Sequence, residues 1–192
     1  SGRRNAHLLA VAPNASSSII CGGTSPSIEP YRANVYTHKT LSGSFQVKNK
    51  YLEEILKDKG LKKDELTAVW KDIAGKEGSV QHLDVLTDDE KEIFKTANEI
   101  DQIWIIEHAA KRQEFICQAQ SVNLFFTIPT ATEPQEVHDE YMQYVNDVHW
   151  YGMNKLKSLY YFRTNAARNA ENVNTKVQRI KLDDAECIAC EG

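Results

Sequence analysis

The sequence lacks any long apolar run and any large excess of charge of one sign. Its longest apolar stretches, such as residues 122–126, are far shorter than the roughly 20 residues that a membrane-spanning helix needs. The formal net charge is -4, so electrostatics indicates neither a nucleic acid nor a membrane surface as a partner. The first residues also lack an initiator Met and the apolar core of a secretion signal. We therefore expect a piece of a longer protein.

Cysteine is scarce, and its positions limit its chemistry. The sequence has Cys21, Cys117, Cys187 and Cys190. Without a secretion signal, a reduced cytosolic setting is expected rather than a disulfide scaffold. The spacing of Cys187 and Cys190 allows a small disulfide ring, which is a reversible two-electron couple. A zinc site would need further ligands that no second Cys pair or spaced His pair supplies, so no metal site is predicted. The alternatives are a dithiol shuttle and two cysteines without a role.

The remaining composition is that of an ordinary globular protein. It is 41% hydrophobic and 26% charged, and 192 residues suit one domain or most of one. We expect loops and short extended segments over 24–47. The other short elements predicted in the first half are a strand over 7–12, a helix between 14 and 21, and helices over 50–59 and 64–74.

Two longer helical patterns determine the predicted fold class. A capping box at Thr87 and Glu90 predicts one helix that reaches about Arg112. Its inner face is predicted to carry Ile93, Ala97, Ile100, Trp104 and His108. A second helix over 133–156, with Val137, Tyr141, Tyr144, Val148 and Tyr151 inward, separates strand patterns at 121–128 and 159–163. This order predicts parallel strands joined by a crossover, hence an α/β fold over 1–164, followed by a flexible tail over 165–192.

Polar residues follow the first strand pattern at 13–18. A strand that leads into a helix start presents unpaired backbone N–H groups and the positive helix end, which together bind phosphate well. The hydroxyls of Ser16, Ser17 and Ser18 can add hydrogen bonds. The alternative is that Asn14 or a serine caps the helix, which is the more frequent use of these residue types.

Tyr160 and Tyr161 form an adjacent aromatic pair at the last strand pattern. Tyrosine is one of the few side chains that can lose an electron and a proton together. Neighbours in a regular strand point to opposite faces, so stacked rings would require a local departure from strand geometry. The alternative is a strand edge that carries two aromatic residues.

In this order, the features resemble a known family. The chain resembles the C-terminal region of the large subunit of class I ribonucleotide reductases, most closely the branch found in phages and enterobacteria. The matching stretches are RNAHL (4–8), APNASSS (12–18), SIEPY (27–31), LSGSF (41–45), GSVQ (78–81), QAQSVN (118–123), KSLYY (157–161) and the pair Cys187 and Cys190.

The resemblance implies the C-terminal portion of a ten-stranded α/β barrel, an incomplete barrel with a flexible tail. The implied activity is the reduction of ribonucleoside diphosphates by a radical mechanism, for DNA precursor synthesis. The family's radical-bearing cysteine, its acid and base residues and its active-site disulfide lie upstream, and Cys21 and Cys117 do not match them. The chain alone is therefore expected to be inactive.

The resemblance also assigns roles by position. The substrate diphosphate would be held by the turn made of Pro13, Asn14, Ala15, Ser16 and Ser17. Tyr160 and Tyr161 would pass the radical inward, with Tyr161 on the side of the small subunit. Cys187 and Cys190 would re-reduce the active-site disulfide.

Partners and cofactors follow from the same resemblance. This chain would carry no cofactor, whereas the partner small subunit would hold a di-iron centre and a tyrosyl radical. The other expected partners are the upstream portion of the large subunit, thioredoxin or glutaredoxin, and the ribonucleoside diphosphate. The expected location is the cytoplasm, that of the host if a phage encodes the chain. The rival readings are a non-catalytic phosphate-binding module and a small dithiol carrier.

Overall fold

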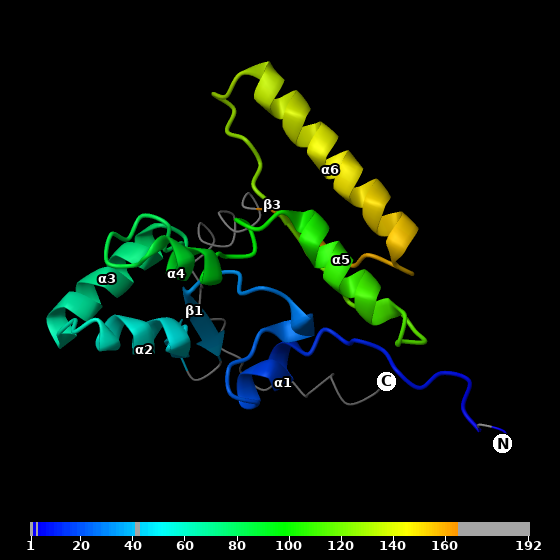
Figure 1. Cartoon of the computed structure of the whole chain (residues 1–192), viewed down its shortest axis with the longest axis horizontal. Helices are drawn as coiled ribbons and strands as arrows, with labels where there is room; N and C mark the ends of the chain where they lie inside the picture. Colours follow the sequence, from blue (N-terminus) through cyan, green and yellow to red (C-terminus); the bar gives the residue numbers. More distant parts are fainter. Residues whose placement is uncertain (1, 3, 41–42, 165–192) are drawn as a thin grey trace, which may run out of the picture.

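A computed structural model of the chain describes residues 2, 4–40 and 43–164 (Figure 1). The elements in the first half are α1 (Ala15–Ile20), the 3-10 turn η1 (Pro26–Ile28), β1 (Val35–Thr40), β2 (Gly43–Lys48), α2 (Lys50–Asp58) and α3 (Lys63–Gly75). Those in the second half are α4 (Asp88–Ile93), α5 (Gln102–Gln113), β3 (Leu124–Phe126), α6 (Gln135–Lys155) and β4 (Phe162–Thr164). The short helices predicted near the serines, at 50–59 and at 64–74 are confirmed.

The parallel pairing expected from the strand–helix–strand order is confirmed. Strands β3 and β4 pair in parallel, with Leu124 opposite Phe162, and α6 forms the crossover between them. The strands are shorter than predicted, and β4 begins after the tyrosine pair. The described chain is thus mixed α/β without a closed barrel.

The strand predicted over 7–12 does not form, but the segment does lie parallel to the residues that precede β3. It contributes a single parallel bridge, Val11 opposite Gln120, on the edge of residues 120–126 that faces away from β4. Ser121 N donates to Val11 O at 2.9 Å, and Gln118 N donates to Leu9 O at 3.0 Å. The chain turns away at Pro13, so this pairing ends before β3 begins.

One hydrophobic core lies between these parallel segments and the helices α5 and α6, which lie alongside each other in Figure 1. Val122, Leu124 and Phe126 are buried against Ile106 of α5 and Val148 of α6. Tyr141, Tyr144 and Tyr151 pack on this core, as predicted from the period of the helix. Val137 was predicted to face inward too, but it is 37% exposed because it lies in the first turn, before the helix reaches the core.

The single helix predicted from Thr87 to about Arg112 is wrong. The capping box at Thr87 and Glu90 is present, but α4 ends at Ile93 and α5 begins only at Gln102. Between them Glu99 accepts hydrogen bonds from Thr96 N (2.7 Å) and Thr96 Oγ1 (2.9 Å). Such local side-chain bonds compete with the helical ladder. Among the residues predicted to face inward, Ala97 is therefore buried, whereas Ile93 and Trp104 are 73% and 63% exposed.

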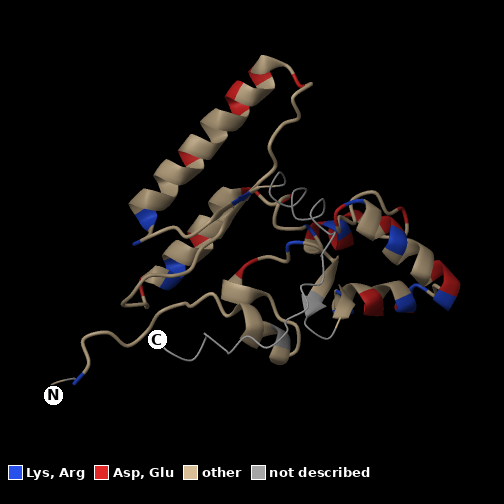
Figure 2. Cartoon of the chain, turned by 180° about the vertical axis from the view of Figure 1, so that it is seen from behind, with Lys and Arg blue, Asp and Glu red and all other residues tan. Residues whose placement is uncertain are grey.

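A second core joins α2, α3 and the first strand of the β1–β2 hairpin, and includes Leu52, Leu56 and Ile73. The hairpin was foreseen only as short extended segments. Lys and Arg alternate with Asp and Glu over α2, α3 and α4, so neither sign dominates this part of the surface (Figure 2). Within the described ranges, no helix is both long enough and apolar enough to cross a membrane.

Candidate functional site

The serine turn, residues 13–17, lies where the chain leaves the parallel bridge and enters α1. Asn14 takes up the left-handed backbone conformation, with φ 50° and ψ 31°, and its side chain does not cap the helix. Ser18 N donates to Asn14 O at 3.0 Å, which is the first intrahelical bond. The N–H groups before it belong to the first helical turn, which has no intrahelical acceptors for them. Residues 13–17 are exposed, so these donors are open to a ligand.

The serine hydroxyls bond back along the chain. Ser17 Oγ donates to Asn14 O at 3.4 Å, and Ser18 Oγ donates to Ala15 O at 3.1 Å. Ser27, in η1, reaches the turn from outside, because its Oγ lies 3.0 Å from Pro13 O and 3.3 Å from Ala12 O. The hydroxyls of Ser17, Ser18 and Ser27 therefore hold the turn and the start of α1 through bonds to backbone carbonyl groups.

The tyrosine pair occupies an irregularity in the parallel ladder. Tyr160 N donates to Val122 O and Leu124 N donates to Tyr161 O, both at 2.9 Å. In a regular parallel ladder one residue would make both bonds. Here two residues share them, so Tyr160 and Tyr161 form a β-bulge opposite Asn123. This is the departure from strand geometry that stacked neighbours require.

The two rings are in contact. Their centroids lie 4.0 Å apart with planes at 47°, and each side chain is half-exposed. A hydrogen bond with Tyr161 raises the pKa of Tyr160 above its usual value, the charge of an ionised Tyr161 acts in the same direction, and Arg163 opposes both. The Arg163 guanidinium lies 5.2 Å from the centre of the Tyr161 ring. Tyr160 thus keeps its phenolic proton at neutral pH, which a coupled loss of electron and proton requires.

Glu29 is a site residue that the sequence did not single out. It stands between Pro26 and Pro30, within the stretch SIEPY that matches the family, but neither signal gave it a role. Its Oε1 accepts hydrogen bonds from Asn123 N and Asn123 Nδ2, each at 2.8 Å, and its Oε2 lies 3.0 Å from the same Nδ2. Burial raises the pKa of the Glu29 carboxyl, while the bonds from Asn123 and the charges of Arg163 and Arg32 act against this rise.

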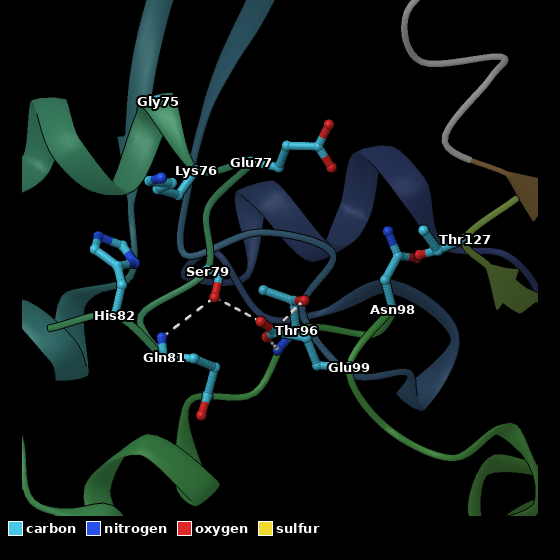
Figure 3. A pocket seen from close by; sticks show the side chains of 10 residues that line it. All are labelled: Gly75, Lys76, Glu77, Ser79, Gln81, His82, Thr96, Asn98, Glu99 and Thr127. Atoms are coloured by element: carbon cyan, nitrogen blue, oxygen red, sulfur yellow. Dashed lines mark hydrogen bonds between the residues drawn. The ribbon is translucent and has the colours of Figure 1, made fainter. Parts of the chain in front are cut away.

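Two hollows lie in the described part of the structure, and the first of them adjoins the serine turn and Glu29. One, of about 600 Å³, lies between the serine turn and β1 and is lined by Ala15, Ser18, Glu29 and His38 among others. The other, of about 490 Å³, lies beside α3, and Figure 3 shows Glu99 in it next to Ser79 and Thr96. Ser79 Oγ donates to Glu99 at 2.5 Å, so the main polar groups of the second hollow bond to one another.

The cysteines do not form a common site in the described part of the chain. Cys187 and Cys190 lie outside the described residues. Cys21 is an exposed free thiol, and Cys117 is a free thiol that fixes the N-terminal segment, since Leu8 N and Leu9 N lie 2.9 and 3.1 Å from its Sγ. These backbone bonds lower the pKa of Cys117. Within the described ranges, no group of His, Cys, Asp and Glu is arranged to hold a metal ion.

The parallel segments, covered by α5 and α6, place the chain in the α/β class. Comparison with known proteins names the family. The model of the family described as "Ribonucleotide reductase, barrel domain" matches residues 1–162. The chain belongs to this family and is a portion of its barrel domain.

The relatives agree with this assignment. The chain is 42% identical to the ribonucleoside-diphosphate reductase large subunit of Invertebrate iridescent virus 3, over 100% of this chain and 29% of the relative. It is 44% identical to the large subunit of Invertebrate iridescent virus 6, over 91% of this chain and 17% of the relative. The structure of the Actinobacillus ureae class Id ribonucleotide reductase alpha subunit is 41% identical, with a TM-score of 0.63, over 85% of this chain and 27% of that one. The chain thus spans less than a third of these proteins.

Proposed function

We propose that the chain is the C-terminal part of the large subunit of a class I ribonucleoside-diphosphate reductase, which converts ribonucleoside diphosphates to 2'-deoxyribonucleoside diphosphates. The observation that carries this proposal is the bulge that brings the rings of Tyr160 and Tyr161 to 4.0 Å. A bulge leaves a ladder less regular and is typical of positions next to active sites. The names of the relatives support the same activity.

In this proposal the serine turn holds the substrate diphosphate. The backbone N–H groups at the start of α1 donate to phosphate oxygens, as helix N-termini do. The residues that form this cradle are Pro13, Asn14, Ala15, Ser16 and Ser17. Two observations support this role. The turn is exposed, and Asn14, in its left-handed backbone conformation, does not cap the N–H groups of the first helical turn with its side chain.

Tyr160 and Tyr161 carry the radical inward. The oxidised Tyr161 takes one electron from Tyr160, and the phenolic proton of Tyr160 moves with that electron along the hydrogen bond to Tyr161. Tyr160 then takes an electron and a proton from the catalytic thiol in the upstream portion. The oxidising equivalent comes from the di-iron and tyrosyl radical centre of the small subunit, and this chain itself holds no cofactor.

Cys187 and Cys190 restore the enzyme after turnover. Reduction of the ribose oxidises two active-site thiols to a disulfide, and the dithiol of the tail reduces it by exchange, becoming a disulfide itself. Thioredoxin or glutaredoxin then returns two electrons and two protons to the tail. Residues 165–192 serve as the arm that carries this dithiol, and the cytoplasm, where these reductants are present, is the proposed location.

The upstream portion of the large subunit is the partner on which all these steps depend. Trp104, Phe115 and Trp150 are 63%, 78% and 69% exposed, and the proposed partner would cover such large apolar side chains. The two rival functions, a phosphate-binding module and a dithiol carrier, explain neither these exposed side chains nor the tyrosine bulge.

Replacement of Tyr160 tests the proposal. In the assembly of this chain with the upstream portion and the small subunit, Tyr160→Phe keeps the ring but cannot pass a proton with the electron. We expect reduction of a ribonucleoside diphosphate to fall by at least about 100-fold, because a step that depends on the placement of this phenol is lost. Tyr51→Phe is the matched control, because Tyr51 is also half-exposed but lies on α2. Equal turnover in the two variants would contradict the role of the pair.

A further inference from the structure

The edge of β3 away from β4 is completed by side chains rather than by a strand. Asn123 N donates to Glu29 and Phe125 N donates to Gln102 Oε1, each at 2.8 Å. Residues 122 and 124 bond to the chain of β4, so the N–H of Asn123 points to the opposite edge. Glu29 therefore takes the place that the segment at Val11 leaves when it turns away at Pro13.

Asn123 is the residue against which the tyrosine bulge forms. Val122 O and Leu124 N, its immediate neighbours, make the bonds to Tyr160 and Tyr161. The position of Asn123 along the strand thus determines where the extra residue of the bulge is placed. Asn123 is 7% exposed, and its Oδ1 is buried without a hydrogen-bond partner among the described residues. The Glu29 carboxylate is thus the described partner of its side chain.

We propose that Glu29 is a positioning residue for radical transfer: through Asn123 it fixes the bulge that keeps the rings of Tyr160 and Tyr161 in contact. The same loop holds the serine turn through Ser27, whose Oγ lies 3.0 Å from Pro13 O. One short loop, residues 27–29, therefore connects the proposed diphosphate cradle to the proposed radical path. This inference rests on the proposed function for its effect on turnover, but not for its effect on the geometry of the tyrosines.

Arg163 completes the arrangement. Its guanidinium lies against the ring of Tyr161, and its charge acts on the Glu29 carboxyl as well. Arg163 thus lies close enough to both Glu29 and Tyr161 for its charge to act on the first and its guanidinium to contact the second. Loss of Glu29 would leave Asn123 N and Asn123 Nδ2 without this acceptor.

The first test measures the tyrosines without any turnover. The chain is assembled with the upstream portion, with 3-fluorotyrosine at position 160, and the pKa of that phenol is followed by fluorine NMR. Glu29→Leu removes the acceptor, the bulge relaxes, and the pKa of the fluorinated Tyr160 falls toward that of free 3-fluorotyrosine. Glu29→Gln retains the pKa of the parent, because its amide still accepts from Asn123 N and can donate to the Asn123 Oδ1. Glu92→Leu is the control for loss of a carboxylate, since Glu92 is exposed and pairs with Lys95.

A charge exchange separates positioning from general damage to the fold. Asn123→Asp replaces the amide donor to Glu29 by a second carboxyl group, so the bulge should relax and the pKa of Tyr160 should lose the rise that comes from its hydrogen bond with Tyr161, as in Glu29→Leu. The double variant Glu29→Gln with Asn123→Asp restores a donor and an acceptor, and should restore the pKa. A double variant that behaves like Asn123→Asp alone would overturn the inference, as would a folded Glu29→Leu variant with an unchanged pKa.

The second test uses turnover with the small subunit added. A misplaced ring pair slows the radical step but leaves diphosphate binding intact, so Glu29→Leu should lower kcat by about 100-fold with KM unchanged. A rise in KM with kcat unchanged would assign Glu29 to substrate binding and overturn the positioning role. If the parent assembly itself shows no turnover, the proposed function fails, while the fluorine measurement still decides whether Glu29 positions the pair.

Discussion

At the residue scale, the site depends on single polar side chains that bond to backbone groups where regular pairing stops. Gln102, 1% exposed, donates to Ala97 O (2.9 Å) and Ile100 O (2.6 Å), and its Oε1 accepts from Phe125 N. Glu29 likewise accepts from Asn123 N. A buried N–H without such an acceptor costs about 1–3 kcal/mol, so each of these side chains stabilises the strand edge it completes.

Which side chain would meet which N–H could not be predicted from the sequence. Glu29 and Asn123 are 94 positions apart, and no local pattern connects them. The residues with a local signal, such as the serines after Pro13 and the pair Tyr160 and Tyr161, were found because their chemistry is visible in a short window. The bulge was anticipated only as a requirement for stacking, since the register of a parallel ladder is a long-range property.

Tyr144 provides a pH-dependent prediction at this scale. Its hydroxyl donates to Asp101 Oδ1 and accepts from Gln102 N, both at 2.8 Å, and burial raises its pKa to about 12 from the usual 10.0. Below pH 10 both folded and unfolded chains keep the proton, and the full stabilisation is present. As the pH rises from 10 toward 12, the unfolded chain ionises first and the stabilisation is lost.

Tyr144→Phe should therefore destabilise the protein by about 1 kcal/mol at pH 8, where two hydrogen bonds are removed. The difference in the free energy of unfolding between the parent and the variant should shrink as the pH approaches 12. Urea unfolding at a series of pH values measures this difference. A difference that stays constant from pH 8 to pH 11.5 would show that Tyr144 has no raised pKa in the folded protein.

At the element scale, the sequence predicted the helices best where they are capped and amphipathic. Both α2 and α3 begin and end within a few residues of their expected bounds. The helix from Thr87 to Arg112 was predicted wrongly because its apolar spacing continued through a segment in which Thr96, Glu99 and Asp101 make local bonds. The strands were predicted too long. The apolar runs at 7–12 and 121–128 do not indicate how many of their residues form hydrogen bonds to a neighbouring strand.

The link between α3 and the β1–β2 hairpin gives the prediction at this scale. Gly78 has φ +85°, and a Cβ there would overlap Ala33, whose Cα would lie 2.8 Å away. Gly78 O also accepts from Asn34 N (3.1 Å) and Asn34 Nδ2 (3.0 Å), so the backbone cannot move away freely. Gly60 has φ +86° with no atom near the Cβ position and is the matched control.

Gly60→Ala should cost about 1–2 kcal/mol, which is the strain of a left-handed alanine. Gly78→Ala adds the steric overlap with Ala33 and should cost about 3 kcal/mol or more. Urea unfolding of the two variants beside the parent measures both costs. Equal losses in the two variants would mean that the contact between Gly78 and Ala33 does not constrain this part of the fold.

At the scale of the whole molecule, the chain is a portion of a larger barrel domain. Among the described residues, the parallel pairings are the bridge between Val11 and Gln120 and the ladder of β3 and β4. Trp104 on α5 and Trp150 on α6 are largely exposed, although both helices pack inward on the same core. The fold class, the parallel crossover and the family were predicted from the sequence, since each depends on the order of patterns along the whole chain. The bounds of the strands and the loop that links the serine turn to the tyrosines were not.

The central claim is that this chain completes a ribonucleotide reductase, and reconstitution tests it most directly. The upstream portion of the large subunit, the small subunit and a dithiol reductant are mixed with a ribonucleoside diphosphate, with and without this chain, and the deoxyribonucleoside diphosphate formed is quantified. The account predicts product only when the chain is present, and none from the chain alone. Product at the same rate without the chain, or none from the complete mixture even though the chain binds the upstream portion, would contradict it.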